Sequence, residues 1–359
     1  MFSKNIGYHT GLNMNGFIKI SQYSGMREDL VQAGGGNSAF KIDSTQMAIK
    51  ASGYQLSEVT EHEGYAVVNP LIIKEAFLNY KNLDEMTEEE SKTILANAHI
   101  KGPKASIETF LHSIAGKYSL HTHAVVVNAI ACRKEGKAIF EKLFPDALVI
   151  PYATPGVELA KAYFKVYKEY KVINGNNEPE IVFLMNHGLL VSADTADRVI
   201  ELTEMVTKKL EQYLEVDFES YHSASNLQAL YGEGIIWRVT DSNILSYFKQ
   251  SGGAWDYCFC PDCVVFLGKK MYENSSDFID KKAFEEFVEE NGIPVVISYK
   301  NNLYIHAVSV KKAMEIQSVL SFSAMVMSMN AKCECNFLSE HEKNYLLNWD
   351  AEKYRKQMK

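Results

Sequence analysis

The feature that most constrains this chain is an alternation between short apolar segments and longer segments with helical spacing. The runs "ALVIPY" (147–152) and "IVFLM" (181–185) are short and apolar enough to predict buried strands. Segments 156–170 and 194–216 carry apolar residues three or four positions apart, which predicts amphipathic helices. Strands that alternate with helices predict an α/β fold in which helices cover a sheet.

A second region follows a soft boundary between about residues 220 and 240, so we predict domains at 1–225 and 226–359. Within it, segments 255–268 and 293–308 have the apolar character of strands, and 309–331 predicts a long helix. The charged, amphipathic segment 338–358 predicts a last helix. We expect this smaller α+β region to pack on the core.

Composition excludes several classes of protein. No stretch approaches the eighteen or so apolar residues of a membrane span, and the N-terminus lacks the apolar core of a secretory signal, so a cytoplasmic location is expected. Six cysteines in 359 residues are too few for a disulfide framework. The formal net charge of -8 argues against nucleic-acid binding, because phosphate contacts need clustered Lys and Arg. We expect neither a nucleic acid nor a membrane as partner.

Three histidines stand in positions suited to metal binding. His121 and His123, in "SLHTHAVVV", are two apart, so an extended strand projects both from one face. His187 lies in "IVFLMNHGLLV", where Asn186 and Gly188 predict a sharp turn at a strand end. Three neutral imidazoles suit Zn²⁺ or another divalent first-row metal and leave a position open. Taken singly, each histidine is more simply explained as a core or surface residue whose ring nitrogens have ordinary hydrogen-bond partners.

A carboxylate precedes these histidines in "PKASIETFLH". Glu108 falls in the first turn of a predicted helix, and Ser106 lies near its start. A carboxylate beside an open metal site can transfer protons to and from a carbon acid. His112 lies four residues later on the same helical face. It could support the metal ligands or pack in the core, and core packing is the slightly simpler explanation.

Two turns of small residues lie further upstream, in "QAGGGNSAFKI" and "AIKASGYQL". They present Asn37, Ser38, Ser52 and Gly53, and backbone N–H groups with hydroxyls can hold a phosphate. They match neither the P-loop nor the Rossmann glycine pattern. A glycine triplet alone is usually only a turn.

Taken together, "AGGGNS", "KASG", "SIET", "HTH" and "NHG", in this order, resemble the class II (metal-dependent) aldolase/adducin family over about 30–216. The segment "YATPGVELA" (152–160) is similar to the rhamnulose-phosphate aldolase branch. The resemblance implies a three-layer α/β/α fold with a central mixed, largely antiparallel sheet. The motifs "CPDCVVFLG", "NNLYIHAVSVKKAMEI" and "NWDAEKYR" are similar to the segment after the aldolase core in long enzymes that fuse this aldolase to a dehydrogenase.

The resemblance also implies roles for residues. Zinc would be bound by His121, His123 and His187, and Glu108 would be the general acid/base. The substrate phosphate would be held by Gly36, Asn37, Ser38, Ser52, Gly53 and Ser106. Many members have two serines before the acid, whereas Ile107 stands here, so Lys41 or Lys50 is a further candidate contact for the anion.

The implied activity is reversible cleavage of a phosphorylated ketose to a dihydroxyacetone-phosphate-like fragment and an aldehyde through a zinc-stabilised enediolate. A sugar-phosphate 4-epimerase and a keto-acid phosphate decarboxylase use the same kind of site and are alternatives. An adducin-like interaction protein is an alternative of another class, disfavoured because such members tend to lose the metal ligands. The family also implies a homo-oligomer, a tetramer, with a sugar phosphate as its small-molecule partner.

Five of the six cysteines fall in the second region. Cys258, Cys260 and Cys263 form C-x-C-x2-C, and Cys333 with Cys335 forms C-x-C. Four thiolates can build a closed structural zinc site. A cysteine is also a common small buried apolar residue, and this second explanation is the simpler one.

Overall fold

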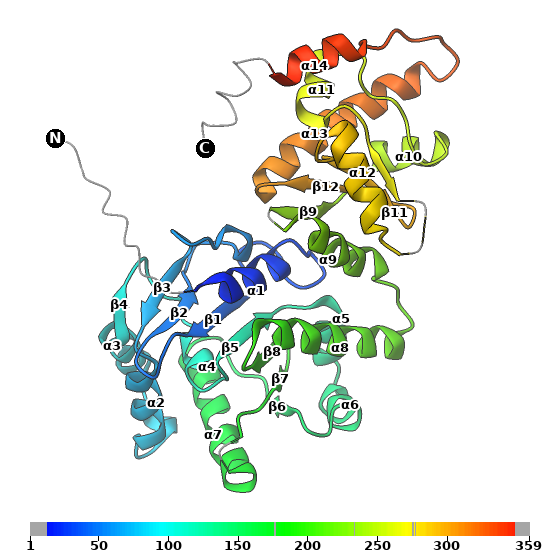
Figure 1. Cartoon of the computed structure of the whole chain (residues 1–359). Coiled ribbons are helices and arrows are strands. Elements are labelled where there is room, and N and C mark those ends of the chain that lie inside the picture. Colours follow the sequence, from blue (N-terminus) through cyan, green and yellow to red (C-terminus); the bar gives the residue numbers. More distant parts are fainter. Residues whose placement is uncertain (1–12, 176, 233, 275, 277, 349–359) are drawn as a thin grey trace, which may run out of the picture. The chain divides into compact units, whose positions relative to one another are not determined.

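The computed structural model describes residues 13–348 except 176, 233, 275 and 277 (Figure 1). The chain divides into two compact units. The first comprises residues 1–25 and 29–215, and the second comprises 26–28 and 216–359. The predicted boundary at residue 225 would fall inside helix α9 (Glu219–Tyr231), which begins the second unit's secondary structure.

The first unit is built on an eight-stranded sheet of order β4-β3-β2-β1-β5-β8-β7-β6. Every neighbouring pair is antiparallel except β6 with β7, which is parallel, so the sheet is mixed and largely antiparallel as predicted. The strands are β1 (Asn37–Lys41), β2 (Met47–Lys50), β3 (Tyr65–Val68), β4 (His99–Lys101), β5 (Tyr118–Thr122), β6 (Leu148–Ile150), β7 (Ile181–Leu184) and β8 (Gly188–Ala193).

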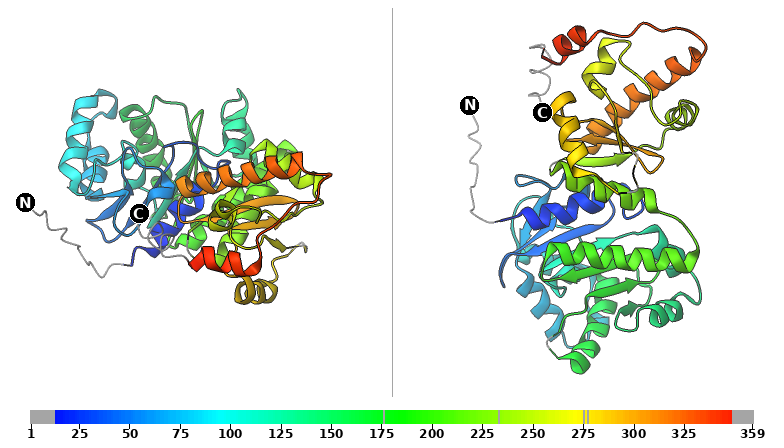
Figure 2. Two further views of the ribbon diagram at one scale, coloured as in Figure 1. Left: turned by 90° about the horizontal axis from the view of Figure 1, so that it is seen from above. Right: turned by 45° about the vertical axis from the view of Figure 1, so that its right-hand side comes forward.

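Helices cover both faces of this sheet and give three layers (Figure 2). Phe40 and Ala48 pack with Phe17 of α1 on one face, whereas Ala39 and Ile49 belong to the larger core on the other. This alternation follows from the two-residue period of a strand. The helices are α1 (Asn15–Gly25), α2 (Pro70–Asn79), α3 (Glu88–Ala98), α4 (Thr109–Ser113), α5 (Val125–Ala131), α6 (Gly136–Leu143), α7 (Val157–Asn174) and α8 (Ala196–Leu214), with short 3-10 turns η1 (Leu56–Glu58) and η2 (Leu83–Glu85).

The second unit has a four-stranded sheet of order β10-β11-β12-β9. Its two faces bury separate cores, with Ile235 and Ile305 on one side and Ile236 and Tyr304 on the other. The elements are β9 (Ile235–Arg238), α10 (Ser242–Gln250), α11 (Pro261–Leu267), β10 (Tyr272–Asn274), α12 (Lys281–Asn291), β11 (Val296–Tyr299), β12 (Asn302–Ala307), α13 (Val310–Met329) and α14 (Glu340–Asn348). The unit is therefore α+β, as predicted.

The prediction of a strand at 255–268 is wrong, because its second half forms helix α11. Pro261 is the first helical residue and Gly268 ends the helix, a pairing that favours one short helical segment. Cys263, Val264 and Leu267 are buried at three-to-four spacing. A short apolar run does not by itself distinguish strand from helix. The predicted last helix is seen as α14, and its continuation to 358 lies outside the described residues.

Within the described part of the chain, every helix is too short or too polar to span a bilayer. All six cysteines are free thiols.

Candidate metal centre and active site

Strand β5 delivers the first two histidines. It lies between β1 and β8, with His121 paired to Asn37 on one side and to Leu190 on the other. His121 is completely buried there, and His123 follows just after the strand ends at Thr122. Because residues two apart project to the same side of an extended chain, both rings point to one place.

The third histidine lies in the tight turn between β7 and β8. Asn186 takes a left-handed conformation with φ of 54°, which Asn tolerates better than most residues. A Cβ at Gly188 would lie 2.2 Å from the carbonyl oxygen of Thr122, so only glycine lets this turn approach β5 so closely. The side-chain amide of Asn128 on α5 donates a hydrogen bond to the carbonyl oxygen of His187, 3.1 Å away. The predicted turn thus brings His187 beside the other two histidines.

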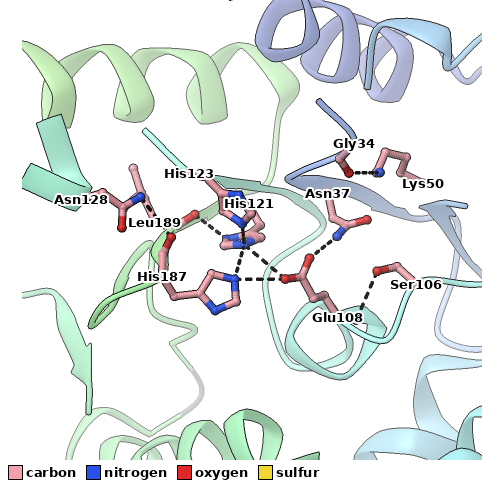
Figure 3. A network of polar contacts seen from close by, with 10 residues as sticks. All are labelled: Gly34, Asn37, Lys50, Ser106, Glu108, His121, His123, Asn128, His187 and Leu189. Atoms are coloured by element: carbon pink, nitrogen blue, oxygen red, sulfur yellow. Dashed lines mark hydrogen bonds and ion pairs between the residues drawn. The ribbon is translucent and has the colours of Figure 1, made fainter. Parts of the chain in front are cut away.

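The three rings meet through their Nε2 atoms (Figure 3). Nε2 of His121 lies 3.2 Å from Nε2 of His187 and 3.1 Å from Nε2 of His123. Oε1 of Glu108 lies 3.1 Å from Nε2 of His187. All four ligand atoms lie within 4.8 Å of one another.

These separations fit a divalent metal ion. Zn–N bonds of about 2.0 Å at tetrahedral angles place two ligand nitrogens about 3.3 Å apart. Nδ1 of His121 is 2.9 Å from the carbonyl oxygen of Leu189, so it donates its proton there and leaves the Nε2 lone pair facing the cluster. The side chains of His187 and Glu108 keep 10% and 13% exposure, so solvent reaches the cluster.

The electrostatics of the cluster favour a positive charge at its centre. Burial raises the pKa of Glu108, but the imidazoles of His121 and His187 outweigh it and hold this pKa well below its usual range. Burial lowers the pKa of His121, and the Glu108 carboxylate reverses this and leaves it raised. Burial followed by His121 lowers the pKa of His123 to about 4, so that ring stays neutral at pH 7. A metal cation supplies the charge that this arrangement favours.

The Glu108 carboxylate is held from its other side. Glu108 is the residue that precedes α4, and its backbone N–H lies 3.3 Å from the hydroxyl oxygen of Ser106. The side-chain amide of Asn37 donates a hydrogen bond to Oε2 of Glu108, which leaves Oε1 directed at the histidines (Figure 3). The predicted acid and one predicted phosphate contact are therefore direct neighbours.

The glycine loop packs against the histidines. A Cβ at Gly35 would lie 2.7 Å from Nδ1 of His123, and one at Gly36 would lie 2.8 Å from the carbonyl oxygen of His121. Gly36 also has φ of +70°, which favours glycine. A Cβ at Gly34, by contrast, would have no neighbouring atom within 4 Å. The role of Gly35 was not predicted, since nothing in the sequence says which ring the loop meets.

The second turn lies beside Ser106. Ala51 forms an isolated antiparallel bridge with Ala105, and the backbone N–H of Ser52 donates to the carbonyl oxygen of Lys104 at 2.9 Å. Ser52 and Gly53 are exposed at this turn. Their N–H and hydroxyl groups are therefore next to the segment that leads into Glu108, although the N–H of Ser52 is already engaged.

The two candidate lysines lie at different places. Nζ of Lys50 donates to the carbonyl oxygens of Gly34, at 3.1 Å, and Tyr54, at 2.7 Å, which leaves its third N–H for another acceptor. Lys41 is four residues along β1 from Asn37, about 13 Å away, and its Nζ donates to the carbonyl oxygen of Ala115. The structure thus brings Lys50 to the cluster and carries Lys41 to the opposite end of the strand.

Two other predicted residues point into the protein core. The hydroxyl of Ser38 is buried and lies 2.6 Å from that of Ser21 on α1, on the face of β1 opposite to Asn37. Ser38 is therefore not beside the histidines, because neighbouring strand residues face opposite sides. His112 is fully buried, with Nδ1 2.7 Å from the hydroxyl of Ser119 and with Nε2 lacking a partner. It packs in the core and does not join the cluster.

Residues 17–214 match the family described as the Class II Aldolase and Adducin N-terminal domain. The chain therefore belongs to the class II aldolase/adducin family. Membership supports a metal-dependent function of aldolase type, and the cluster of three histidines and one glutamate could bind such a metal. The narrower likeness to the rhamnulose-phosphate branch stays a prediction.

The relatives are distant. The protein named uncharacterized oxidoreductase YuxG from Bacillus subtilis (strain 168) is 28% identical over 197 residues, which are 50% of this chain and 26% of that protein. The chain thus matches about a quarter of that relative's length. A solved class II aldolase domain of a conserved Thermoplasma acidophilum protein is 23% identical, with a TM-score of 0.48, over 60% of this chain and 97% of that one. A solved L-fuculose 1-phosphate aldolase is 18% identical, with a TM-score of 0.38, over 59% of this chain and 93% of that one.

Proposed function

We propose that the protein is a metal-dependent carbon–carbon lyase. Its reaction would be the reversible cleavage of a phosphorylated ketose to a dihydroxyacetone-phosphate-like fragment and an aldehyde. The observation that carries this proposal is the meeting of three imidazole Nε2 atoms and Oε1 of Glu108 within 4.8 Å. Membership of the class II aldolase/adducin family supports a metal-dependent function of aldolase type.

The metal would be held by His121, His123 and His187, and we propose zinc because three imidazoles and an open position suit it. A bound divalent cation supplies positive charge that stabilises negative charge developing on the substrate oxygens. Binding requires neutral imidazoles. The lowered pKa of His123 keeps that ring neutral, and the hydrogen bond from Nδ1 of His121 to the carbonyl oxygen of Leu189 directs Nε2 of His121 at the cluster, where the cation would take the place of a proton.

Glu108 would move the proton. A carboxylate is ionised at neutral pH, so it can accept a proton. In the joining direction, Oε1 removes a proton from the carbon next to the substrate carbonyl. In the cleavage direction, the same oxygen returns a proton to that carbon after the carbon–carbon bond has broken. The amide of Asn37 on Oε2 keeps Oε1 directed at the site.

The substrate phosphate would lie beside the glycine loop and the turn at Ser52 and Gly53. Lys50 contributes a buried ammonium group with one uncommitted N–H. Ser106 adds a hydroxyl next to the Glu108 backbone. An anion bound there would fix the reacting carbons relative to Glu108, which lowers the barrier through orientation.

A Glu108→Gln variant tests the proposal. The amide has the size of the carboxylate but cannot accept the proton, so we expect metal content to stay near wild type and turnover to fall by about 10²- to 10⁴-fold. Glu75→Gln, an exposed position on α2, is the matched control and should leave both unchanged. Wild-type turnover in Glu108→Gln would remove the proton-transfer role.

The products discriminate the alternatives. A panel of ketose phosphates is incubated with the protein, and released aldehyde is trapped chemically. Aldehyde release supports the lyase, whereas an isomerised sugar without aldehyde indicates an epimerase, and carbon dioxide indicates a decarboxylase. A purified protein with no bound divalent metal and no histidine-dependent affinity for one indicates an adducin-like interaction protein. Light scattering tests the proposed homo-tetramer.

A further inference from the structure

The second unit contains two cysteines whose sulfur atoms are in contact. Sγ of Cys260 lies 3.4 Å from Sγ of Cys263, and both are free thiols. Among the described residues, the one group of three or more metal-ligating side chains is that around Glu108, so no further ligand completes a zinc site at this pair. The contact therefore involves these two thiols and no third metal-ligating side chain from the described residues.

The start of α11 explains why these side chains face each other. Cys260 precedes the helix in an extended conformation, with φ of -142° and ψ of 161°, and Pro261 is the first helical residue. Cys263 is the third helical residue, and the residue before a helix and its third residue are neighbours across the first turn, the two positions that a capping box also uses. Val264 and Leu267 are buried and hold the helix in the core.

The two thiols differ in access. Cys263 is completely buried, whereas Cys260 is partly exposed. Burial, followed by the contact with Cys260, raises the pKa of the Cys263 thiol. A reagent from solution therefore reaches Cys260 first, and Cys263 is placed to react only with its neighbour.

Cys258 is close in sequence but is engaged elsewhere. Its Sγ lies 3.1 Å from the carbonyl oxygen of Lys269, to which the thiol donates. Burial, followed by Asp256, raises the pKa of this thiol to about 12. Of these three neighbouring cysteines, Cys260 and Cys263 are the two whose sulfur atoms are in contact.

We propose that Cys260 and Cys263 form a thiol–disulfide exchange site that takes small-molecule disulfides as its reactant. The Cys260 sulfur, after losing its proton, attacks one sulfur of the reactant, whose S–S bond breaks and whose other half leaves as a thiol after taking up that proton. Cys263 then loses its proton and attacks Cys260, which forms the protein disulfide and releases the second half as a thiol. Two protein thiols are oxidised and one reactant disulfide is reduced to two thiols.

The test uses the full chain and oxidised glutathione at increasing ratios to reduced glutathione. Remaining thiols are alkylated under denaturing conditions, and peptides are identified by mass spectrometry. We expect a cross-link between Cys260 and Cys263 to appear before any other, with loss of two alkylatable thiols. Cys263→Ser should accumulate a mixed disulfide on Cys260, because the second attack is removed. Cys260→Ser should leave Cys263 unmodified, because it is buried.

Cys132 is the control, since it is exposed and lies outside the pair. In the Cys132→Ser variant, the cross-link between Cys260 and Cys263 should form as it does in the wild type. The proposal is overturned if Cys260 and Cys263 carry separate glutathione adducts in the wild-type protein, or if the first cross-link joins other cysteines. It is also overturned if the pair stays reduced at ratios that modify Cys132. The readout does not depend on lyase activity.

Discussion

The side-chain amide of Asn37 donates a hydrogen bond to the carboxylate of Glu108, although 71 residues separate them. Asn37 begins β1 and is paired with His121 on β5. One strand pairing therefore places both a metal-ligand candidate and the group that orients the carboxylate. Oε1 of Glu108 faces His187 because Oε2 is occupied by Asn37.

This hydrogen bond predicts a graded effect of substitutions at Asn37. Asn37→Ala frees the Glu108 carboxylate to turn, so we expect turnover to fall by about tenfold to a hundredfold with the metal retained, because the loss is one of orientation. Asn37→Asp places a second negative charge beside the first, which raises the pKa of Glu108 and should reduce turnover further. Steady-state kinetics and metal analysis of both variants check this order. Equal activity in Asn37→Ala and wild type would contradict it.

The glycine loop allows a matched pair of variants. A Cβ at Gly35 would lie 2.7 Å from Nδ1 of His123, whereas one at Gly34 meets nothing within 4 Å. Gly35→Ala must displace the His123 ring, so we expect at least a tenfold loss of metal affinity. Gly34→Ala should bind metal as wild type does. Competition with a chelator measures both affinities, and equal values for the two variants would show that the loop does not position His123.

The two lysines predict different effects on substrate binding. A hydrogen bond to a charged group contributes about 1.5–3 kcal/mol, so Lys50→Met should raise KM for a phosphorylated substrate by about 10- to 100-fold. Lys41→Met removes a lysine from the far end of β1 and should leave KM unchanged. Steady-state kinetics of both variants measures KM, and circular dichroism checks that each variant is folded. A larger KM effect at Lys41 than at Lys50 would place the anion elsewhere.

The buried His112 predicts a dependence of stability on pH. Burial, followed by the charge of His121, lowers the pKa of His112 to about 3 in the folded protein, whereas the unfolded chain takes up that proton near pH 6.5. Between these values the unfolded state binds more protons, so the free energy of unfolding falls as pH falls from 6.5, by at most about 1.4 kcal/mol per pH unit.

His112→Gln removes this titration, so the free energy of unfolding should decrease less steeply as the pH is lowered from 6.5 to 4. Urea unfolding of the metal-free protein at several pH values measures it. His62→Gln, at an exposed position, controls for the substitution itself and should keep the wild-type slope. An unchanged slope in His112→Gln would mean that His112 takes up its proton without unfolding.

Local patterns predicted the elements that carry the candidate site. The apolar run before His187 and the Asn-His-Gly sequence predicted a strand and a sharp turn, and the structure has β7 ending at Leu184 and Asn186 in the left-handed region. The two-residue spacing of His121 and His123 predicted that both rings share one side. These inferences succeed because strand alternation and turn chemistry depend on residues close in sequence.

Other features depended on long-range contacts. The apolar run of 261–267 is compatible with strand or helix, and besides Pro261 and Gly268 at its ends, the packing of Cys263, Val264 and Leu267 in the core of the second unit favours the helix. The separation of Lys41 from Lys50 and the inward direction of Ser38 follow from how β1 and β2 are placed in the sheet. No spacing in the sequence predicted that Asn128 would contact His187 or that Gly35 would contact His123.

By itself, then, the amino-acid sequence determined which side chains could bind a metal and transfer a proton, since residue type and local spacing set chemistry and direction. Only the tertiary structure decided which of them meet. Strand order and register bring β1, β5 and the β7–β8 turn together from distant parts of the chain. That assembly depends on burying the two faces of one sheet, a property that no short segment possesses alone.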